Sequence, residues 1–331
     1  MNCAYLAFTD RGMALAHRLA QAHPGTVDRC GKDGVRLGDW TSRNFARCNA
    51  LVFVGAVGIA VRAIAPHCRS KATDPAVVVV DEAGQFAIPV LSGHLGGANA
   101  LARTLAAACG AVPVITTATD VRGVFAVDEW AKQAGCAVLE PERIKQVSGR
   151  LLAGEPVGFW SEFPVNGTPP AGVSPAPAQQ ADFALTLFPQ GEGLHLVPAI
   201  GVLGVGCRRG TTAQQLEAAF AAFCARYALS PRCICAAASI DLKQNEAGLL
   251  EFCAAHRWAV SFYSAGQLKT VPGNFTPSAF VCSVTGVDNV CERAAALAAG
   301  GTIRIPKQAA DGVTFALALR PYAPDWRNQN G

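Results

Sequence analysis

The residues best suited to chemistry lie in a glycine-rich segment at positions 92–99, which holds His94 among three glycines. Glycines on both sides would expose the imidazole on a loop just before an Ala/Leu-rich helical pattern. An imidazole moves protons near neutral pH better than other side chains, and such groups usually act from loops on a rigid scaffold. The segment therefore predicts an acid–base group at His94. A loop histidine that makes one structural hydrogen bond is the alternative.

Two other segments of the N-terminal half combine turn residues with charge. Gly55 and Gly58 precede Arg62, so the backbone could approach a ligand and a helix N-terminus could face an anion. Thr117 and Asp120 stand in a run of hydroxyls that also contains a guanidinium. A tight strand-to-helix turn and ordinary turn chemistry are the structural alternatives.

The C-terminal half offers positive charge in the same kind of setting. Arg208 and Arg209 stand between glycines, just before a helix that Thr211 or Thr212 would cap. Arginine forks bind carboxylates through two hydrogen bonds, and a helix N-terminus adds to the attraction. The segment predicts an anion site, with a solvated surface pair as the alternative.

Three later segments, at positions 239–243, 284–293 and 306–308, place opposite charges at successive strand ends of one domain. Their candidate residues are Asp241, Lys243, Thr285, Asn289, Glu292 and Lys307. Each has a local explanation as an exposed ion pair, a helix cap or a solvated charge. Their recurrence at strand ends favours a site, because ligands bind at the carboxyl edge of open α/β sheets.

Neither the cysteines nor the histidines are spaced as metal ligands. The 13 cysteines include no C-x-x-C pair, and the histidines show no H-x-x-H or H-x-x-x-H spacing. The cysteines are interpreted as buried small hydrophobic residues in a reducing cytosol. The sequence therefore predicts no metal site and no disulfide framework.

The elements that must position these segments alternate as expected for βαβ units, which predicts the α/β class. The N-terminal strands are expected at 3–8, 51–55, 77–81 and 112–116, and the helices at 11–22, 59–64, 98–109 and 127–134. A helix ending at residue 152, a strand near 157–160 and a proline-rich loop at 163–180 follow. The C-terminal strands are expected at 200–205, 234–239, 260–263, 303–305 and 313–319, and the helices at 212–227, 246–255 and 290–299.

This pattern predicts two three-layer α/β/α domains with largely parallel sheets, joined by a small middle segment. The expected boundaries are 1–140, 141–198 and 199–331. The chain's 331 residues are about twice a usual single domain, which agrees with that division. The prolines of the middle segment make it the best place for a hinge.

Composition excludes several classes of protein. Hydrophobic residues make up 51% of the chain and charged residues 16%, so sizeable cores are available. A net charge of +4 is far from the basic field of a nucleic-acid binder. The longest apolar stretch, 51–61, is too short to span a membrane, and the N-terminus is typical of a first strand rather than a signal peptide. A cytoplasmic protein that acts on an acidic small molecule is expected.

Taken in order, these segments resemble the cobalt-precorrin-5A hydrolase family of anaerobic cobalamin biosynthesis. The likeness runs through 55–62, 92–99 and 116–120, and then through 204–211, 239–243 with 248–250, 285–293 and 306–308. It is nearly end to end, although the middle region carries little motif content. The resemblance implies an N-terminal α/β domain, a short middle region and a C-terminal α/β domain.

The resemblance also implies a reaction. Members of this family open the δ-lactone of cobalt-precorrin-5A with water and release acetaldehyde, giving cobalt-precorrin-5B. The implied partner is thus an anionic tetrapyrrole that carries its own cobalt, and no cofactor of the protein's own is expected. Contact with other enzymes of the pathway and a homodimer are left open.

This chemistry suggests roles for the candidate residues. His94 is expected to be the base, with Asp120, Asp241 or Glu292 as alternatives. Backbone N–H groups around Gly93, Gly96 and Gly97, with Ser92 and Asn99, are expected to stabilise the oxyanion. Arg208, Arg209, Lys243 and Lys307 are expected to bind the carboxylates of the macrocycle.

Two other functions remain open at this point. Strand–turn–helix units with glycines could belong to a nucleotide-dependent oxidoreductase, although neither glycine-rich turn has the G-x-G-x-x-G spacing. A protein that only binds corrinoid intermediates, without catalysis, is the second alternative.

Overall fold

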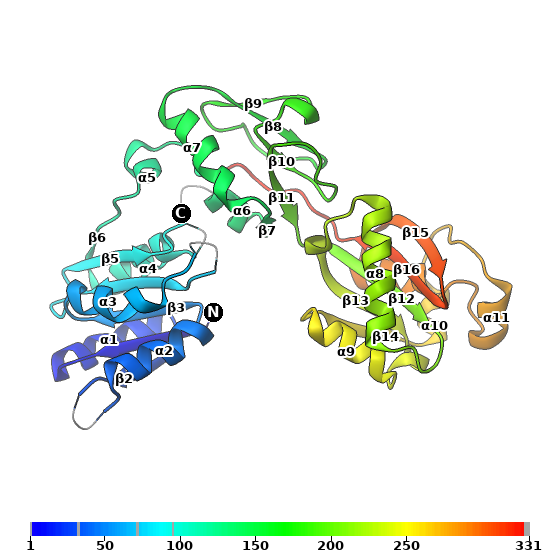
Figure 1. Ribbon diagram of the computed structural model, residues 1–331, viewed down its shortest axis with the longest axis horizontal. Coiled ribbons are helices and arrows are strands. Elements are labelled where there is room, and N and C mark those ends of the chain that lie inside the picture. The colour runs from blue at the N-terminus through cyan, green and yellow to red at the C-terminus, as the bar shows by residue number, and fades with distance from the viewer. Residues whose placement is uncertain (1, 32–33, 71–72, 95, 328–331) are drawn as a thin grey trace. The chain divides into compact units, whose positions relative to one another are not determined.

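The structure is a computed structural model that describes residues 2–31, 34–70, 73–94 and 96–327. The chain divides into two compact units (Figure 1). The first unit comprises Met1–Lys132 and Ile144–Glu155, and the second comprises Gln133–Arg143 and Pro156–Gly331.

The first unit is built on a six-stranded sheet with the order β2-β1-β3-β4-β5-β6. Its strands are β1 (Cys3–Ala7), β2 (Thr26–Arg29), β3 (Ala50–Val54), β4 (Ala76–Val80), β5 (Phe86–Leu91) and β6 (Val112–Pro113). The first four strands are parallel, but β5 runs antiparallel to β4, and β6 is parallel to β5. The sheet therefore has two strands that point against the other four.

Helices cover both faces of this sheet. They are α1 (Asp10–Ala22), α2 (Leu37–Arg47), α3 (Val57–Ile64) and α4 (Ala98–Cys109). In β1, Tyr5 packs with α1 and α4, whereas its neighbour Leu6 packs against Trp40 of α2. Strands buried on both faces form continuous apolar runs, which is why β1, β3 and β4 were recognisable in the sequence.

Three shorter helices complete the first unit: α5 (Ala118–Arg122), α6 (Val127–Gln133, whose last residue belongs to the second unit) and α7 (Ile144–Leu152). Arg122 of α5 donates a hydrogen bond to the carbonyl of Leu152 at 2.9 Å, which ties α5 to the end of α7. The 3-10 helix η1 (Ala65–His67) follows α3.

The second unit contains two five-stranded sheets. The first has the order β7-β11-β10-β8-β9 and is parallel except for β7. Its strands are β7 (Cys136–Val138), β8 (Val157–Ser161), β9 (Val173–Pro175), β10 (Phe183–Leu185) and β11 (Leu194–Pro198). The loop expected at 163–180 thus contains a strand. Runs of three residues are too short to show alternation, so the sequence pattern missed β7, β9 and β10, and it also missed the five-residue β11.

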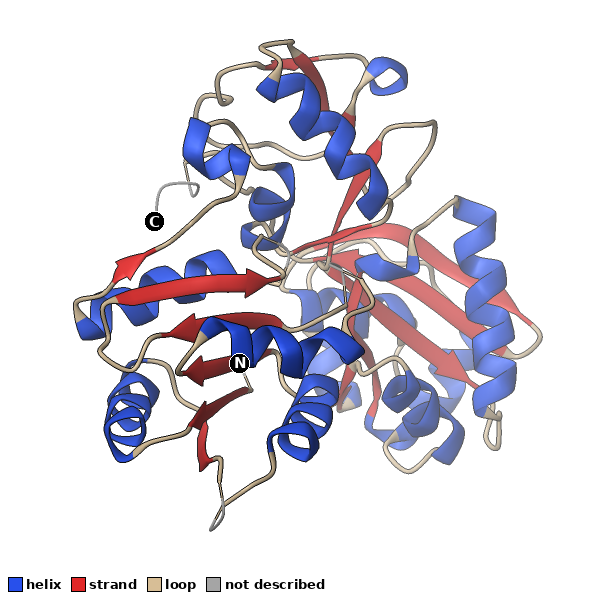
Figure 2. Cartoon of the chain, turned by 60° about the vertical axis from the view of Figure 1, so that its left-hand side comes forward, coloured by secondary structure: helices blue, strands red, loops and turns tan. Residues whose placement is uncertain are grey.

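The last sheet has the order β14-β13-β12-β16-β15. Its strands are β12 (Gly201–Cys207), β13 (Ile234–Ile240), β14 (Ala259–Tyr263), β15 (Thr302–Ala310) and β16 (Val313–Leu319). Strands β12, β13 and β14 are parallel, and β16 runs antiparallel to both β12 and β15. Figure 2 shows its strands as arrows with helices beside them.

The helices of this sheet again form two outer layers. They are α8 (Ala213–Tyr227), α9 (Ala247–Ala255), α10 (Ala265–Lys269), α11 (Ala279–Thr285) and α12 (Cys291–Ala299). Phe220 of α8 and Phe252 of α9 share one core, whereas Leu268 of α10 and Ala295 of α12 share the core on the other face. The remaining 3-10 helices are η2 (Pro141–Arg143), η3 (Ala178–Gln180), η4 (Pro231–Cys233) and η5 (Asp241–Lys243).

The predicted α/β class is confirmed, and the main differences concern short or polar elements. The strand expected at 112–116 ends at Pro113, which has no N–H for a sheet hydrogen bond. The expected strand list lacked β5, which returns from β4 through a turn held by Asp81: its Oδ1 accepts the N–H groups of Gln85 and Phe86. Among the described residues, no helix is long and apolar enough to cross a membrane.

Candidate functional site

His94 lies in the loop that joins β5 to α4, and close packing shapes that loop. Ser92 adopts a left-handed backbone (φ 57°), while its Oγ donates to the carbonyl of Asp74 at 3.0 Å. A Cβ on Gly96 would collide with the side chain of Ser92, and one on Gly97 would collide with the ammonium of Lys132. Gly96 is therefore needed for close approach, whereas Gly97 is favoured by its left-handed backbone (φ 90°), because the lysine side chain could move aside. Leu95 lies outside the described residues.

Two carboxylates hold the imidazole of His94 from opposite sides. Its Nε2 lies 2.8 Å from Oδ2 of Asp120, and its Nδ1 lies 3.2 Å from Oδ1 of Asp128. The side chains of all three residues are largely buried, with exposed fractions of 9%, 12% and 7% for His94, Asp120 and Asp128. A neutral imidazole has only one N–H, so ionised carboxylates at both of its nitrogens require a second proton or another cation there.

The surroundings of the ring determine its protonation. Burial alone would lower the pKa of His94, but the hydrogen bonds and charges of Asp128 and Asp120 outweigh it and raise the pKa to about 9. In the absence of any other cation, the imidazole therefore carries a proton on both nitrogens at neutral pH.

Asp120 is the most connected member of the cluster. It comes from α5, whose N-cap residue is Thr117. Its Oδ1 accepts a hydrogen bond from Arg103 at 2.8 Å, and its Oδ2 accepts one from Nδ2 of Asn99 at 3.1 Å. Asn99, which is 3% exposed, also donates to Oγ1 of Thr117 at 3.0 Å. The structure thus brings together His94, Asn99, Thr117 and Asp120, which the sequence had placed in two separate motifs.

Helix α6 supplies residues that the sequence reasoning missed. Asp128 holds the ring, and the half-buried Glu129 directs its carboxylate toward the same cluster. Burial raises the pKa of Glu129, although the charge of His94 opposes that effect. The signal that could have identified them is the pair of acidic residues in the first turn of an expected helix. Acidic residues are common at that place in any helix, however, because they interact favourably with the helix dipole.

The cluster has the chemistry of a metal site as well as of an acid–base site. One ligand atom each from His94, Asp120 and Glu129 lie within 4.8 Å of one another. Imidazole nitrogen and carboxylate oxygen are common ligands of divalent ions. No spacing along the chain indicated such a site, because the three residues come from segments without metal-ligand spacing.

The segment at 55–62 lies at the other edge of the sheet. Gly55 follows β3, and its N–H donates to the carbonyl of Val80 at the end of β4. Because β5 runs antiparallel to β4, Leu91 pairs with Val77 near the start of β4, so the loop of His94 leaves the opposite edge. Strands of five residues separate the two edges by roughly 15 Å. The structure therefore places Gly55, Gly58 and Arg62 away from the loop of His94, at the opposite edge of the sheet.

The basic residues of the second unit gather after β12 and β13. Arg208 and Arg209 are exposed in the loop before α8, and Lys243 lies in η5, which begins at Asp241. Glu246, which the sequence analysis did not single out, accepts from the N–H of Gly210 at 3.0 Å and from Nζ of Lys243 at 2.9 Å. The two arginines are the more available anion ligands, because Lys243 already has a carboxylate partner.

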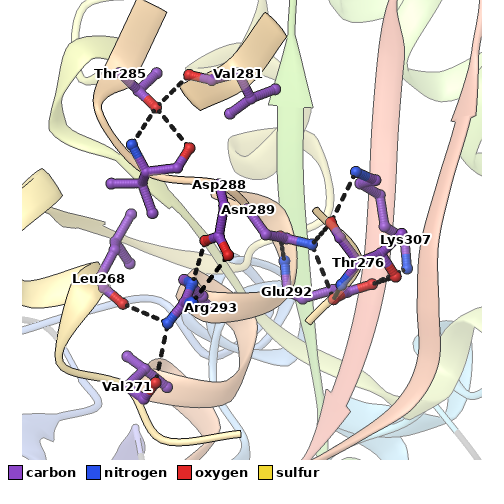
Figure 3. A network of polar contacts seen from close by, with 11 residues as sticks. Leu268, Val271, Thr276, Val281, Thr285, Asp288, Asn289, Glu292, Arg293 and Lys307 are labelled. Carbon is purple, nitrogen blue, oxygen red and sulfur yellow. Dashed lines mark hydrogen bonds and ion pairs between the residues drawn. The ribbon is translucent and has the colours of Figure 1, made fainter. Parts of the chain in front are cut away.

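Glu292 belongs to the second unit and serves as an anchor for its neighbours (Figure 3). Its carboxylate accepts from the N–H and Oγ1 of Thr276, from Nδ2 of Asn289 and from the N–H of Lys307, at 2.6–2.9 Å. The side chain is 2% exposed. A buried carboxylate with so many donors holds α12, β15 and the loop at Thr276 together, which is a structural role rather than that of a base.

The remaining candidates of this region also make local contacts. Nζ of Lys307 donates to the carbonyl of Thr276 at 3.1 Å. Oγ1 of Thr285 donates to the carbonyls of Val281 and Val287, which closes the end of α11 (Figure 3). Asn289 is buried and accepts from the N–H of Glu292 at 2.8 Å.

The fold and the cluster define an α/β protein with a buried, charged histidine centre. Three family models match the chain in order: "Cobalamin synthesis G N-terminal" over residues 39–120, "Cobalamin biosynthesis central region" over 125–186 and "Cobalamin synthesis G C-terminus" over 201–318. The chain belongs to this cobalamin synthesis G family.

Two curated relatives are similar over most of their length. The cobalt-precorrin-5A hydrolase of Salmonella typhimurium is 35% identical over 342 residues, covering 96% of this chain and 97% of the relative. The cobalt-precorrin-5A hydrolase of Priestia megaterium is 33% identical over 301 residues, covering 84% and 80%. The solved structure of a cobalamin biosynthesis protein G homolog from Sulfolobus solfataricus is 21% identical, with a TM-score of 0.42 and 97% of both chains covered.

Proposed function

We propose that the chain hydrolyses cobalt-precorrin-5A, opening its δ-lactone with water and releasing acetaldehyde to give cobalt-precorrin-5B. The observation that carries this proposal is the 35% identity to a relative of that name over 96% of the chain. The cobalt would enter with the substrate, as part of the tetrapyrrole.

The buried cluster of His94, Asp120, Asp128 and Glu129 is the reaction centre in this proposal. Attack of water on the lactone carbonyl needs a base for the water proton and a positive group for the developing oxyanion. Both ring nitrogens of His94 face carboxylates, so the protonated ring has no lone pair with which to accept a proton. In this proposal His94 contributes its positive charge near the developing oxyanion, and the base is the half-buried carboxylate of Glu129.

The second half of the reaction uses the same groups. Ring opening consumes one water and leaves a carboxylic acid and a hydroxyl group. Loss of the hydroxyl proton to a carboxylate lets the neighbouring carbon–carbon bond break, so that acetaldehyde leaves while the electron pair stays on the macrocycle carbon, which then takes a proton. The carboxylate of Glu129 as base, beside the positive charge of His94, suits both steps.

The exposed arginines of the second unit bind the substrate's peripheral carboxylates in this proposal. Arg208 and Arg209 lie at the carboxyl end of β12, where ligands of α/β sheets usually bind. Their forks suit carboxylates on a large anionic ring.

An anaerobic incubation with cobalt-precorrin-5A tests the reaction. Trapped acetaldehyde, with a corrinoid lighter by that fragment and heavier by one water, is the expected result. Tight binding of cobalt-precorrin-5A without release of acetaldehyde would show instead that the protein binds corrinoids and does not hydrolyse them.

A further inference from the structure

We propose that His94, Asp120 and Glu129 form a binding site for one divalent first-row transition-metal ion. Their ligand atoms lie within 4.8 Å of one another, at the meeting point of the β5–α4 loop, α5 and α6. Nothing in the family match or in the relatives' names assigns a metal to these residues. The site stands on the geometry of the first unit alone.

The donor set fits this class of ion. A histidine with two carboxylates supplies one nitrogen and two oxygen ligands, which suits Zn²⁺ or Mn²⁺ better than Ca²⁺, whose sites contain oxygen only. Nε2 of His94 and Oδ2 of Asp120 are already 2.8 Å apart, a separation that adjacent ligands of one ion can adopt. The ion would supply the positive charge that this contact requires.

The surroundings hold the ligands in place. Asp128 lies behind the ring, with Oδ1 at 3.2 Å from Nδ1, and a metal-bound histidine almost always directs its other nitrogen to such a group. Arg103 holds Oδ1 of Asp120 at 2.8 Å and leaves Oδ2 directed at the histidine. Nδ1 of His94 and Oδ1 of Asp120 are thus occupied, while Nε2 of His94 and Oδ2 of Asp120, which also accepts from Asn99, face each other.

Three protein ligands leave open coordination positions, as catalytic metal sites do. If the proposed hydrolysis is right, water and the lactone carbonyl oxygen would take these positions. The ion would then polarise the carbonyl in place of His94 and lower the pKa of the bound water, and Glu129 would act as a ligand rather than as the free base. Only this role depends on the proposed function. The binding of the ion does not.

Binding is tested on the whole chain without substrate. Chelator-treated protein is titrated with ZnCl₂ by calorimetry and with MnCl₂ by electron paramagnetic resonance. We expect one ion per chain for each probe. Glu129→Gln and His94→Ala should weaken binding about 10-fold or more, and Asp128→Asn about 10-fold.

Matched controls separate the site from general binding. His17 and Glu82 lie outside the cluster in the same unit, so His17→Ala and Glu82→Gln should bind as the wild type does. Glu129→Gln keeps the shape of the side chain, and no hydrogen bond between described residues involves the Glu129 carboxylate, so it remains informative if His94→Ala fails to fold.

Failure of either probe to bind, or equal binding by wild type and Glu129→Gln, would overturn the metal site. Stoichiometric binding with no aldehyde release would support the metal site and reject the proposed reaction. Full turnover by protein shown to be metal-free would support the proposed reaction and would overturn the catalytic role of the metal ion.

Discussion

Oδ1 of Asp128 lies 3.2 Å from Nδ1 of His94, so α6 fixes the orientation of a ring that belongs to the β5–α4 loop. The glycine-rich loop alone would leave the imidazole several orientations. With Asp128 behind it, Nε2 is directed at Asp120. Asp128 is therefore a positioning residue, and its effect should differ from that of the residues that meet the substrate.

Replacement of Asp128 by Asn should lower kcat about 10- to 100-fold while KM changes little, because such a residue orients the group that acts. Steady-state acetaldehyde release measures both constants. A rise in KM alone would show that Asp128 contributes to substrate binding instead.

Removal of the His94 ring should have a larger effect. His94→Ala should lower turnover by about 100-fold or more, the scale of proton-transfer or oxyanion stabilisation. Circular dichroism should show an intact fold, because the ring lies in a loop and not in the main cores. His17→Ala is the matched control, and near-normal turnover by His94→Ala would remove His94 from the reaction centre.

The paired arginines of the second unit should affect binding. Arg208→Ala combined with Arg209→Ala should raise KM more than it lowers kcat, because in the proposed function the guanidinium groups hold carboxylates that do not react. The exposed Arg232, whose change to Ala should leave KM unaltered, is the control. A fall in kcat at constant KM would place the pair in the transition state.

Glu292 should matter for stability. Glu292→Ala leaves the donors of Thr276, Asn289 and Lys307 without their acceptor, which should cost about 2–4 kcal/mol of unfolding free energy. Urea unfolding measures this loss, with the exposed Glu251→Ala as control. A variant that is as stable as wild type yet inactive would instead support the catalytic role that the sequence suggested.

The interpretation of the cysteines as buried residues is wrong for Cys68 and Cys282, which are exposed, and thiol labelling tests the burial of others. Burial raises the pKa of Cys3 to about 11 and raises the pKa of Cys291 further, so at pH 8 almost none of either is thiolate. A maleimide should therefore label the exposed Cys68 and Cys282 first, and should label Cys3 and Cys291 only after unfolding. Peptide mass spectrometry after a short pulse measures the order, and early labelling of Cys291 would contradict the packing of α12.

Several motif glycines are required by close packing of the backbone rather than by contact with a ligand. A Cβ on Gly204 would collide with the carbonyl of Cys291, and one on Gly248 would collide with the carbonyl of Thr211. The sequence showed these glycines in a recurring order, but it could not distinguish a close backbone approach from a ligand loop, because both require the missing side chain.

The sequence by itself determined the α/β class, most long strands and helices and the resemblance to one family, and it singled out His94 and Asp120 as motif residues. Apolar runs and helical periodicity are local properties, so they can be read along the chain. The short strands of the middle sheet have no such signal.

Only the tertiary structure decided which motifs meet. The turn at Asp81 reverses β5, so the loops after β5 and β6 leave one edge of the sheet and Gly55 lies at the other. That reversal, together with the placement of α6, brings Asp128 and Glu129 to His94. Strand direction and helix docking depend on contacts between distant residues, and no spacing within a motif records them.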